Sequence, residues 1–245
     1  MPKVIAVTSG KGGTGKSSIC SGLGYSLAKQ GNRTLIIELD FGLRCMDIIF
    51  GMKDVPYDVA SVLDGKCDVN TASQKSPLAS NLYILCAPKD PFYVVTAEQI
   101  TQICQDVKKY YDYIIIDTGA GINSHVFDIV AQSNLILVVT TPDPICIRDA
   151  RMMSDAFYNR GNQRQRLIIN KVTKNAMGYS LVRDLDEIID TIGVQLIGVI
   201  PEDYQVVAST GTGQPLPSGS PSLTALEAIA KRIQGEEVSL TIKIG

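Results

Sequence analysis

Residues 10–17 combine glycines, two lysines and a serine at a spacing that suits the binding of a polyphosphate. The stretch reads GKGGTGKS and fits the pattern G-x-x-x-x-G-K-[ST], between an apolar run and a helical pattern. Glycines let backbone N–H groups turn inward around phosphate oxygens, because a β-carbon would penalise the conformations required. The sequence therefore predicts a site for a nucleoside triphosphate.

The side chains of this stretch have distinct expected roles. Lys16 can bridge the β- and γ-phosphates, and the Ser17 hydroxyl can ligate Mg²⁺. The first N–H groups of the following helix carry partial positive charge, which favours a bound anion. The residues expected to bind the phosphates are Gly10, Lys11, Gly12, Gly13, Thr14, Gly15, Lys16, Ser17 and Ser18.

Acidic residues at the ends of two predicted strands are the candidate metal ligands. Asp40 follows a strand over 34–39, and Asp117 ends a strand over 113–117. Ligands of open parallel sheets gather beyond the carboxyl ends of the strands. We expect Ser17, Asp40 and Asp117 to surround the metal, and Asp40 to orient the attacking water. A role of Asp117 as the N-cap of the next turn stays open.

The same glycines permit a second interpretation. Residues 10–15 also match the dinucleotide-binding pattern G-x-G-x-x-G, and Glu38 stands about 20 residues further on. Hydride transfer has no use for Lys16 and Ser17, or for the acidic strand end at Asp117. A glycine-rich turn without any ligand would place two lysines beside an electropositive helix start. A phosphate-binding loop accounts for more of these residues.

The spacing of the apolar runs predicts an α/β fold with a doubly wound, mostly parallel sheet and helices on both faces. Runs such as YIIID and LILVV lack alternation, which is typical of strands covered on both faces. A stretch rich in Gly, Pro and Ser at 211–221 is expected to be a loop before a final helix over 223–233. The predicted strands span 3–9, 34–39, 82–86, 113–117, 135–140, 167–170 and 196–200.

Composition and charge favour a globular protein of a reducing compartment. The chain has 245 residues and a net charge of −2, so it lacks the positive field that attracts nucleic acid. Its six cysteines form no C-x-x-C pair, which fits reduced thiols in the cytoplasm and disfavours zinc and iron–sulfur sites. No stretch approaches the ~20 apolar residues of a membrane span. We expect a single domain over 1–235 and a short tail over 236–245.

Several blocks of the sequence resemble the MinD/ParA family of deviant Walker A ATPases, which have the P-loop NTPase fold. KGGTGKS, with Lys11 ahead of the glycine pair, is similar to the phosphate loop of that family. The similarity extends over about residues 3–235 and is strongest to the branch that places the division site. The further blocks are DFGLRCMD (40–47), SVLDGKCDVNTA (61–72), NLYILCAP (81–88), DTGAGI (117–122), TTPDPICIRDA (140–150) and GVIPEDYQVVAST (198–210).

The resemblance implies a cytoplasmic ATPase that uses ATP and Mg²⁺, forms an ATP-dependent homodimer and acts through regulatory protein partners. Lys11 resembles an arginine finger supplied in trans, so the implied catalytic residues are Lys11, Lys16 and Asp40. Asn170 and Pro201 are expected beside the adenine, with ordinary strand-end and turn roles left open. The implied function is slow ATP hydrolysis coupled to positioning of the division site or another cellular structure.

Two departures from the family pattern keep alternatives open. Glu38 stands where the family usually has aspartate, so the resemblance does not fix the hydrolysis rate. The end EEVSLTIKIG alternates with period two, unlike the cationic amphipathic helix by which such proteins contact the inner face of the cell membrane. The alternatives are ParA-type partitioning, flagellar placement, and a nucleotide-sensing scaffold with vestigial hydrolysis. Peripheral membrane contact stays open, and nucleic acid is not expected as a partner.

Overall fold

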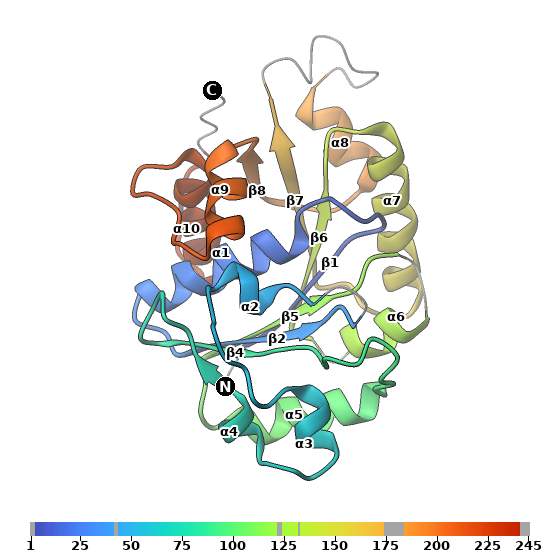
Figure 1. Ribbon diagram of the computed structural model, residues 1–245. Coiled ribbons are helices and arrows are strands. Elements are labelled where there is room, and N and C mark those ends of the chain that lie inside the picture. Colours follow the sequence, from blue (N-terminus) through green and yellow to red (C-terminus); the bar gives the residue numbers. More distant parts are fainter. Residues whose placement is uncertain (1–2, 42–43, 122–123, 132, 174–183, 241–245) are drawn as a thin grey trace.

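The computed structural model describes residues 3–41, 44–121, 124–131, 133–173 and 184–240. These residues form an eight-stranded sheet in the order β3-β4-β2-β5-β1-β6-β7-β8, with helices on both faces (Figure 1). Neighbouring strands are parallel, except that β3 pairs with β4 in the antiparallel sense. The predicted α/β fold with a doubly wound, mostly parallel sheet is confirmed.

Helices and strands mostly alternate along the chain, as crossover connections between parallel strands require. The strands are β1 (Lys3–Thr8), β2 (Thr34–Leu39), β3 (Gln74–Lys75), β4 (Leu82–Leu85), β5 (Tyr113–Thr118), β6 (Leu135–Thr140), β7 (Gln165–Val172) and β8 (Leu196–Pro201). The helices are α1 (Lys16–Lys29), α2 (Met46–Ile49), α3 (Val59–Leu63), α4 (Val69–Ala72), α5 (Ala97–Val107), α6 (Ser124–Val130), α7 (Pro144–Asn159), α8 (Leu185–Ile192), α9 (Tyr204–Thr212) and α10 (Pro221–Gln234).

The two faces of the sheet bury separate sets of apolar side chains. Along β1, Val4 and Ala6 belong to one cluster, whereas Ile5 and Val7 belong to the other. Successive residues of a strand point to opposite faces. Helices α3 to α8 contribute side chains to the first cluster, and α1, α2 and α10 contribute side chains to the second. A strand covered on both faces must therefore be apolar throughout, which explains the unbroken apolar runs.

The structure contains all seven predicted strands, two with the predicted bounds and the others with ends that differ by at most two residues. It adds β3, a two-residue strand without an apolar pattern that could have predicted it. The predicted loop over 211–221 is too long, because α9 continues to Thr212 and α10 begins at Pro221. The hydroxyl of Ser220 caps α10, and proline is well suited to the first turn of a helix. These local effects start the helix before the apolar pattern shows it.

Ile229 of α10 packs directly over Gly198 of β8. Ile229 is fully buried, and a β-carbon on Gly198 would collide with its side chain. We expect Ile229→Ala to lower the free energy of unfolding by about 3 kcal/mol, because it leaves a cavity. Adding Gly198→Ala should restore about 1 kcal/mol, since the new methyl group enters that cavity. Denaturant unfolding measures both values, and a double variant no more stable than Ile229→Ala would contradict this packing.

Candidate nucleotide-binding site

The loop between β1 and α1 is tied to the end of β7 through its carbonyl groups. Asn170 donates from Nδ2 to the carbonyl of Thr14 at 2.7 Å, and Lys171 donates from Nζ to the carbonyl of Gly13 at 2.8 Å. Lys171 has a φ of 56°, which is uncommon for a residue with a β-carbon. These contacts hold the loop carbonyl groups toward β7. The N–H groups of the loop then remain available to bind an anion.

Close packing explains some glycines of this loop but not others. A β-carbon on Gly10 would lie 2.6 Å from the Cβ of Asp149 and 2.7 Å from its backbone carbonyl. Gly15 has a φ of 94° and faces the side-chain amide of Asn170. By contrast, nothing described lies within 4 Å of a β-carbon added at residue 12 or 13. The tip of the loop is therefore open to whatever approaches from outside.

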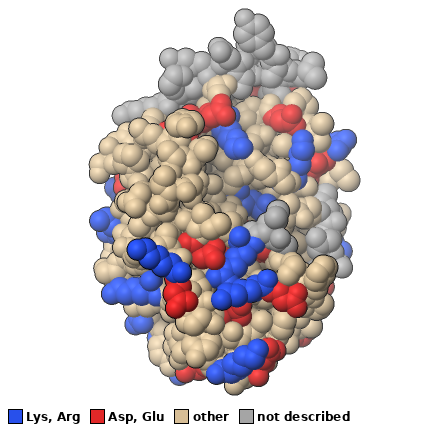
Figure 2. Space-filling model, in the orientation of Figure 1, with Lys and Arg blue, Asp and Glu red and all other residues tan. Residues whose placement is uncertain are grey.

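A cleft of about 730 Å³ lies between this loop, α2, α9 and the ends of β7 and β8. Figure 2, in the orientation of Figure 1, shows basic and acidic side chains gathered across the lower middle of the molecule and an uncharged area on the upper left. The structure thus brings together loop and strand ends that are far apart in the sequence. The predicted site residues that line the cleft are Gly12, Gly13, Gly15, Lys16, Ser17, Ser18, Asp40, Asn170 and Pro201.

Positive charge is concentrated where α1 begins. Lys16 is the first residue of the helix and only 6% exposed. The first turn contains no acidic residue, and Gly15 at the N-cap supplies no side-chain acceptor. The first N–H groups of a helix lack partners within the helix and carry partial positive charge. A buried ammonium group beside them is unfavourable unless an anion is bound, so this is the anion-binding part of the cleft.

Asp117 lies behind this helix end with one carboxylate oxygen free. The residue is fully buried in β5, and its Oδ1 accepts a hydrogen bond from the Cys20 thiol at 3.4 Å. Its Oδ2 has no partner among the described atoms. Burial raises the pKa of Asp117 from 3.8 to about 7, although the nearby Ser17 hydroxyl and the charge of Lys16 lower it. Its place inside β5 excludes the N-cap alternative.

These groups fit a Mg²⁺ ion that takes most of its ligands from elsewhere. The unpartnered oxygen of Asp117 is costly without a cation or a donor. The adjacent Ser17 hydroxyl supplies a further oxygen. In the described parts of the chain no cluster of three or more His, Cys, Asp or Glu side chains forms a dedicated metal site. Mg²⁺ commonly keeps several waters and binds few protein oxygens together with phosphates.

Glu38 and Asp40 have different surroundings, although both belong to the end of β2. Glu38 is fully buried and accepts hydrogen bonds from backbone N–H groups. Asp40 lies just beyond β2, is partly exposed and lines the cleft. Of these two carboxylates, Asp40 is therefore the one that can reach water in the cleft.

Lys11 lies at the outer side of the loop. Its Nζ is 3.9 Å from Oδ1 of Asp143, the N-cap residue of α7, and the two side chains are 44% and 48% exposed. A long, exposed ion pair contributes little to stability because water screens it. Lys11 does not line the cleft of its own chain. The ammonium group can thus leave Asp143 at small cost in free energy.

The sequence interpretation missed an apolar wall of the cleft. Ile48 and Ile49 of α2 face this space together with Val206 and Val207 of α9. No residue of α9 is buried, so the helix depends on its contact with α2. This contact joins segments more than 150 residues apart, and no local pattern signals it. Lys171 was missed as well, because its contact depends on an unusual backbone angle.

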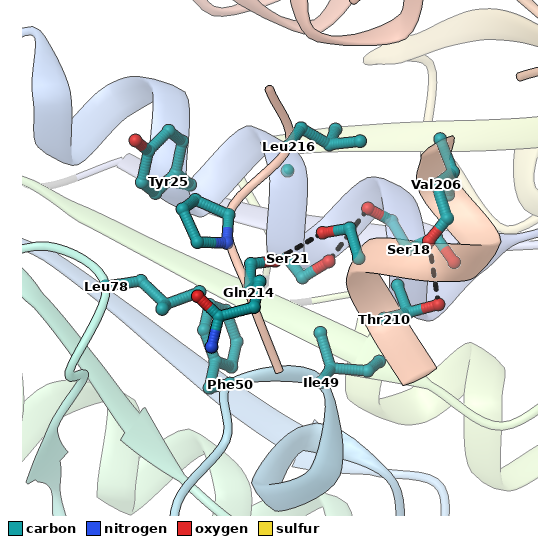
Figure 3. Close-up of a pocket in the computed structure, with 13 residues that line it drawn as sticks. Ser18, Ser21, Tyr25, Ile49, Phe50, Leu78, Val206, Thr210, Gln214 and Leu216 are labelled. Atoms are coloured by element: carbon teal, nitrogen blue, oxygen red, sulfur yellow. Dashed lines mark hydrogen bonds between the residues drawn. The ribbon is translucent and has the colours of Figure 1, made fainter. Parts of the chain in front are cut away.

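The contact between α2 and α9 separates the cleft from a smaller pocket. At this contact a β-carbon on Gly51 would lie 2.9 Å from the carbonyl oxygen of Gly213. Figure 3 shows the smaller pocket, where Tyr25 of α1, Phe50 and Leu216 supply apolar surface. Its volume is about 30 Å³. That space is far too small for a nucleotide, so the larger cleft is the candidate site.

Known proteins with similar sequences and structures show the family of the chain. The family model described as CobQ/CobB/MinD/ParA nucleotide binding domain matches residues 5–216. The septum site-determining protein MinD of Bacillus subtilis is 32% identical over 249 residues, which cover 99% of this chain and 92% of that protein. A chain of the MinC:MinD cell division protein complex of Aquifex aeolicus has a TM-score of 0.90 at 30% identity, covering 99% of this chain and 100% of that chain. A MinD of Pyrococcus horikoshii complexed with Mg-ADP shares the fold, with a TM-score of 0.84 at 24% identity over 95% of this chain and 96% of that chain.

Replacing Asp117 by asparagine should stabilise the nucleotide-free protein at alkaline pH. The pKa of about 7 in the folded state exceeds the ordinary 3.8, so folding binds this proton more tightly. The free energy of unfolding of the unaltered protein should therefore fall between about pH 4 and pH 7. We expect Asp117→Asn to be more stable by about 1–3 kcal/mol at pH 8 and nearly equal at pH 4. Denaturant unfolding in EDTA tests this, and a constant difference at all pH values would refute it.

Proposed function

The chain belongs to the MinD/ParA family of ATPases, and from that premise we propose that it is a MinD-type switch that dimerises on Mg-ATP and hydrolyses ATP slowly. In this role it positions the division site or another cellular structure through protein partners and membrane contact. The observation that carries the proposal is the anion site at the start of α1, where the buried Lys16 acts electrostatically on Asp117, a buried carboxylate with one unpartnered oxygen. The septum site-determining relative and the MinC:MinD complex support the cellular role.

In this proposal, different residues of the cleft bind the phosphates, bind the metal and orient the attacking water. Residues 10–18 surround the phosphates, with Lys16 on the β- and γ-phosphates. Ser17 and Asp117 hold Mg²⁺, with Asp40 at the edge of the metal shell. When bound, Mg²⁺ neutralises charge on the phosphate oxygens. Asp40 orients the attacking water, because its carboxylate is the acidic group that reaches the cleft from β2. The Mg-ADP bound to the Pyrococcus relative supports this choice of cofactors.

The base of the nucleotide lies, in our proposal, against the apolar wall. Asn170 and Pro201 border the cleft at the ends of β7 and β8, near Val206 and Val207 of α9. Base pockets commonly combine apolar surface with a few polar groups that fix the orientation of the ligand. We propose that the ATPase unit spans residues 1–235 and that 236–245 form a tail.

Membrane contact rests on the family relationship alone. No helix in the described ranges is long and apolar enough to cross a membrane. Residues 236–240 form neither helix nor strand, and the Arg232 guanidinium donates to the carbonyls of Val238 and Ser239. Residues 241–245 lie outside the described residues. We propose peripheral contact at the inner face of the cell membrane for the ATP-bound dimer.

Lys11 is the group by which we propose that each monomer completes the site of the other. It is half-exposed, held by a weak pair with Asp143, and placed beside the open loop tip at residues 12–13. A second loop can approach such a tip because no side chain projects from it. An ammonium group supplied in this way stabilises the charge that develops during phosphoryl transfer. Hydrolysis then requires the dimer.

ATP binding is the first test of the proposed function. We expect titration calorimetry to detect binding of ATP and ADP in the presence of Mg²⁺. Lys16→Ala should weaken binding by about 10- to 100-fold, the value of a charge-assisted hydrogen bond. Lys66→Ala removes an exposed lysine remote from the cleft and should leave binding unchanged. No heat from any purine triphosphate would refute the proposed function.

Lys11→Ala tests the role of the second monomer. The variant should fold and bind ADP normally, because Lys11 lies outside the cleft of its own chain. With ATP it should dimerise poorly and lose at least about tenfold in turnover, because an arginine-finger type of contact is missing. Sedimentation and phosphate release measure the two effects, with Lys66→Ala as the control. Unchanged ATP turnover would exclude catalysis in trans by Lys11 and would leave ATP binding itself untouched.

A further inference from the structure

We propose that Glu38 is a positioning residue for ATP hydrolysis, which holds Asp40 in place by fastening α2 to the sheet. This inference rests on the proposed function and concerns the same cleft. Glu38 is one of two fully buried carboxylates beside each other in the sheet, since it is the register partner of Asp117 in the neighbouring strand β5. The two differ in their partners, and this difference assigns their roles.

Both oxygens of the Glu38 carboxylate accept hydrogen bonds from backbone donors. Oε1 accepts from the N–H groups of Cys45 at 2.6 Å and Met46 at 3.0 Å, and Oε2 accepts from the N–H group of Ala87 at 3.1 Å. Asp117, by contrast, keeps a free Oδ2. A carboxylate with three such bonds is a poor candidate for direct contact with a metal. Glu38 therefore holds the start of α2 and the end of β4 to β2, whereas Asp117 has the oxygen that is available to a cation.

The bonds of Glu38 close a loop that contains Asp40. Glu38 lies on β2, whereas Cys45 is the N-cap residue of α2 and provides no side-chain cap of its own. Asp40 follows Glu38 by two residues, so the carboxylate that holds Cys45 and Met46 to β2 lies next to Asp40 in the chain. Fixing the backbone beside a residue reduces the conformational freedom of that residue. A group that orients water must be held closely, because a shift of about 1 Å can cost about 100-fold in rate.

The same contacts fix the wall of the cleft and the adjoining strand end. Arg44 reinforces the arrangement by donating to the carbonyl of Ala87 at 3.3 Å and to Asp47 at 2.9 Å. Ala87 follows β4; its N–H group donates to Glu38 of β2, and its carbonyl accepts from Arg44 in the segment before α2. α2 in turn places Ile48 and Ile49 in the cleft and supports α9.

The length of the side chain decides whether the three bonds can form. Aspartate would withdraw the carboxylate by about 1.5 Å, one carbon–carbon bond. The donor distances of 2.6–3.1 Å would then rise to about 4.1–4.6 Å, beyond hydrogen-bond range. Glutamine keeps the length but turns an N–H₂ group toward at least one backbone N–H. Both substitutions should therefore loosen the loop that carries Asp40.

The test compares Glu38→Gln and Glu38→Asp with Asp58→Asn in the full chain. Asp58 is a matched control, because it is a buried carboxylate that accepts from Ser61 and Lys89 backbone N–H groups and does not line the cleft. We expect both Glu38 variants to lower kcat by about 10- to 100-fold, with nucleotide Kd changed less than about threefold. The Mg²⁺ concentration for half-maximal activity should stay the same. Asp58→Asn should lose stability but keep its kcat.

A second readout follows the fastening directly. Amide hydrogen exchange at Met46 and Ala87 should be slow in the unaltered protein and faster in both Glu38 variants. Wild-type kcat in either folded Glu38 variant would overturn the inference alone, as would a rise in the Mg²⁺ requirement that matches the loss of rate. Failure of both variants to fold would assign Glu38 a purely structural role and also overturn it. Absence of ATP turnover in the unaltered chain would overturn the proposed function as well.

Discussion

The site depends on a buried positive charge that no carboxylate of the first helical turn offsets. Lys16 is almost fully buried at a helix end that is itself electropositive, and the first turn of α1 contains no acidic residue. Such an arrangement is stable only with a bound anion or with strong support from the surrounding fold. The fold provides that support, because Gly10 packs on α7 and the carbonyls of residues 13–14 are held by β7. The loop is thus preorganised for phosphate before any ligand arrives.

The parallel sheet explains why the other site residues come to the same place. β2, β5 and β7 all end at the edge where α1 begins, and the end of each carries a polar group of the site. Asp40, Asp117 and Asn170 are far apart in the sequence but meet because parallel strands share a direction. The ligand position beyond the carboxyl ends of the strands is the general expectation for open α/β sheets. The chemistry of the cleft is therefore a consequence of topology and of a few strand-end residues.

The sequence predicts the parts of the site that depend on local chemistry. The phosphate loop, Asp40 and Asp117 could be identified because glycine spacing and strand ends are visible in a single sequence. The wall formed by α2 and α9 could not, since it rests on the approach of Gly51 to Gly213. The contact of Lys171 with the loop could not be predicted for a similar reason, because the left-handed backbone of Lys171 is set by the tertiary structure. Short elements such as β3 and α2 have too few residues to show a period.

The consequence of a glutamate at position 38, where the family usually has aspartate, can be explained only from the structure. In the sequence it is a longer acid where the family usually has a shorter one, next to a residue expected to orient water. In the structure its extra methylene group brings the carboxylate to the backbone N–H groups of two different segments. Its neighbour Asp117 has the same burial but keeps one oxygen free. Two adjacent buried acids therefore need different partners, because two uncompensated charges at one place would not be stable. Backbone donors satisfy one of them, which leaves the other to a cation.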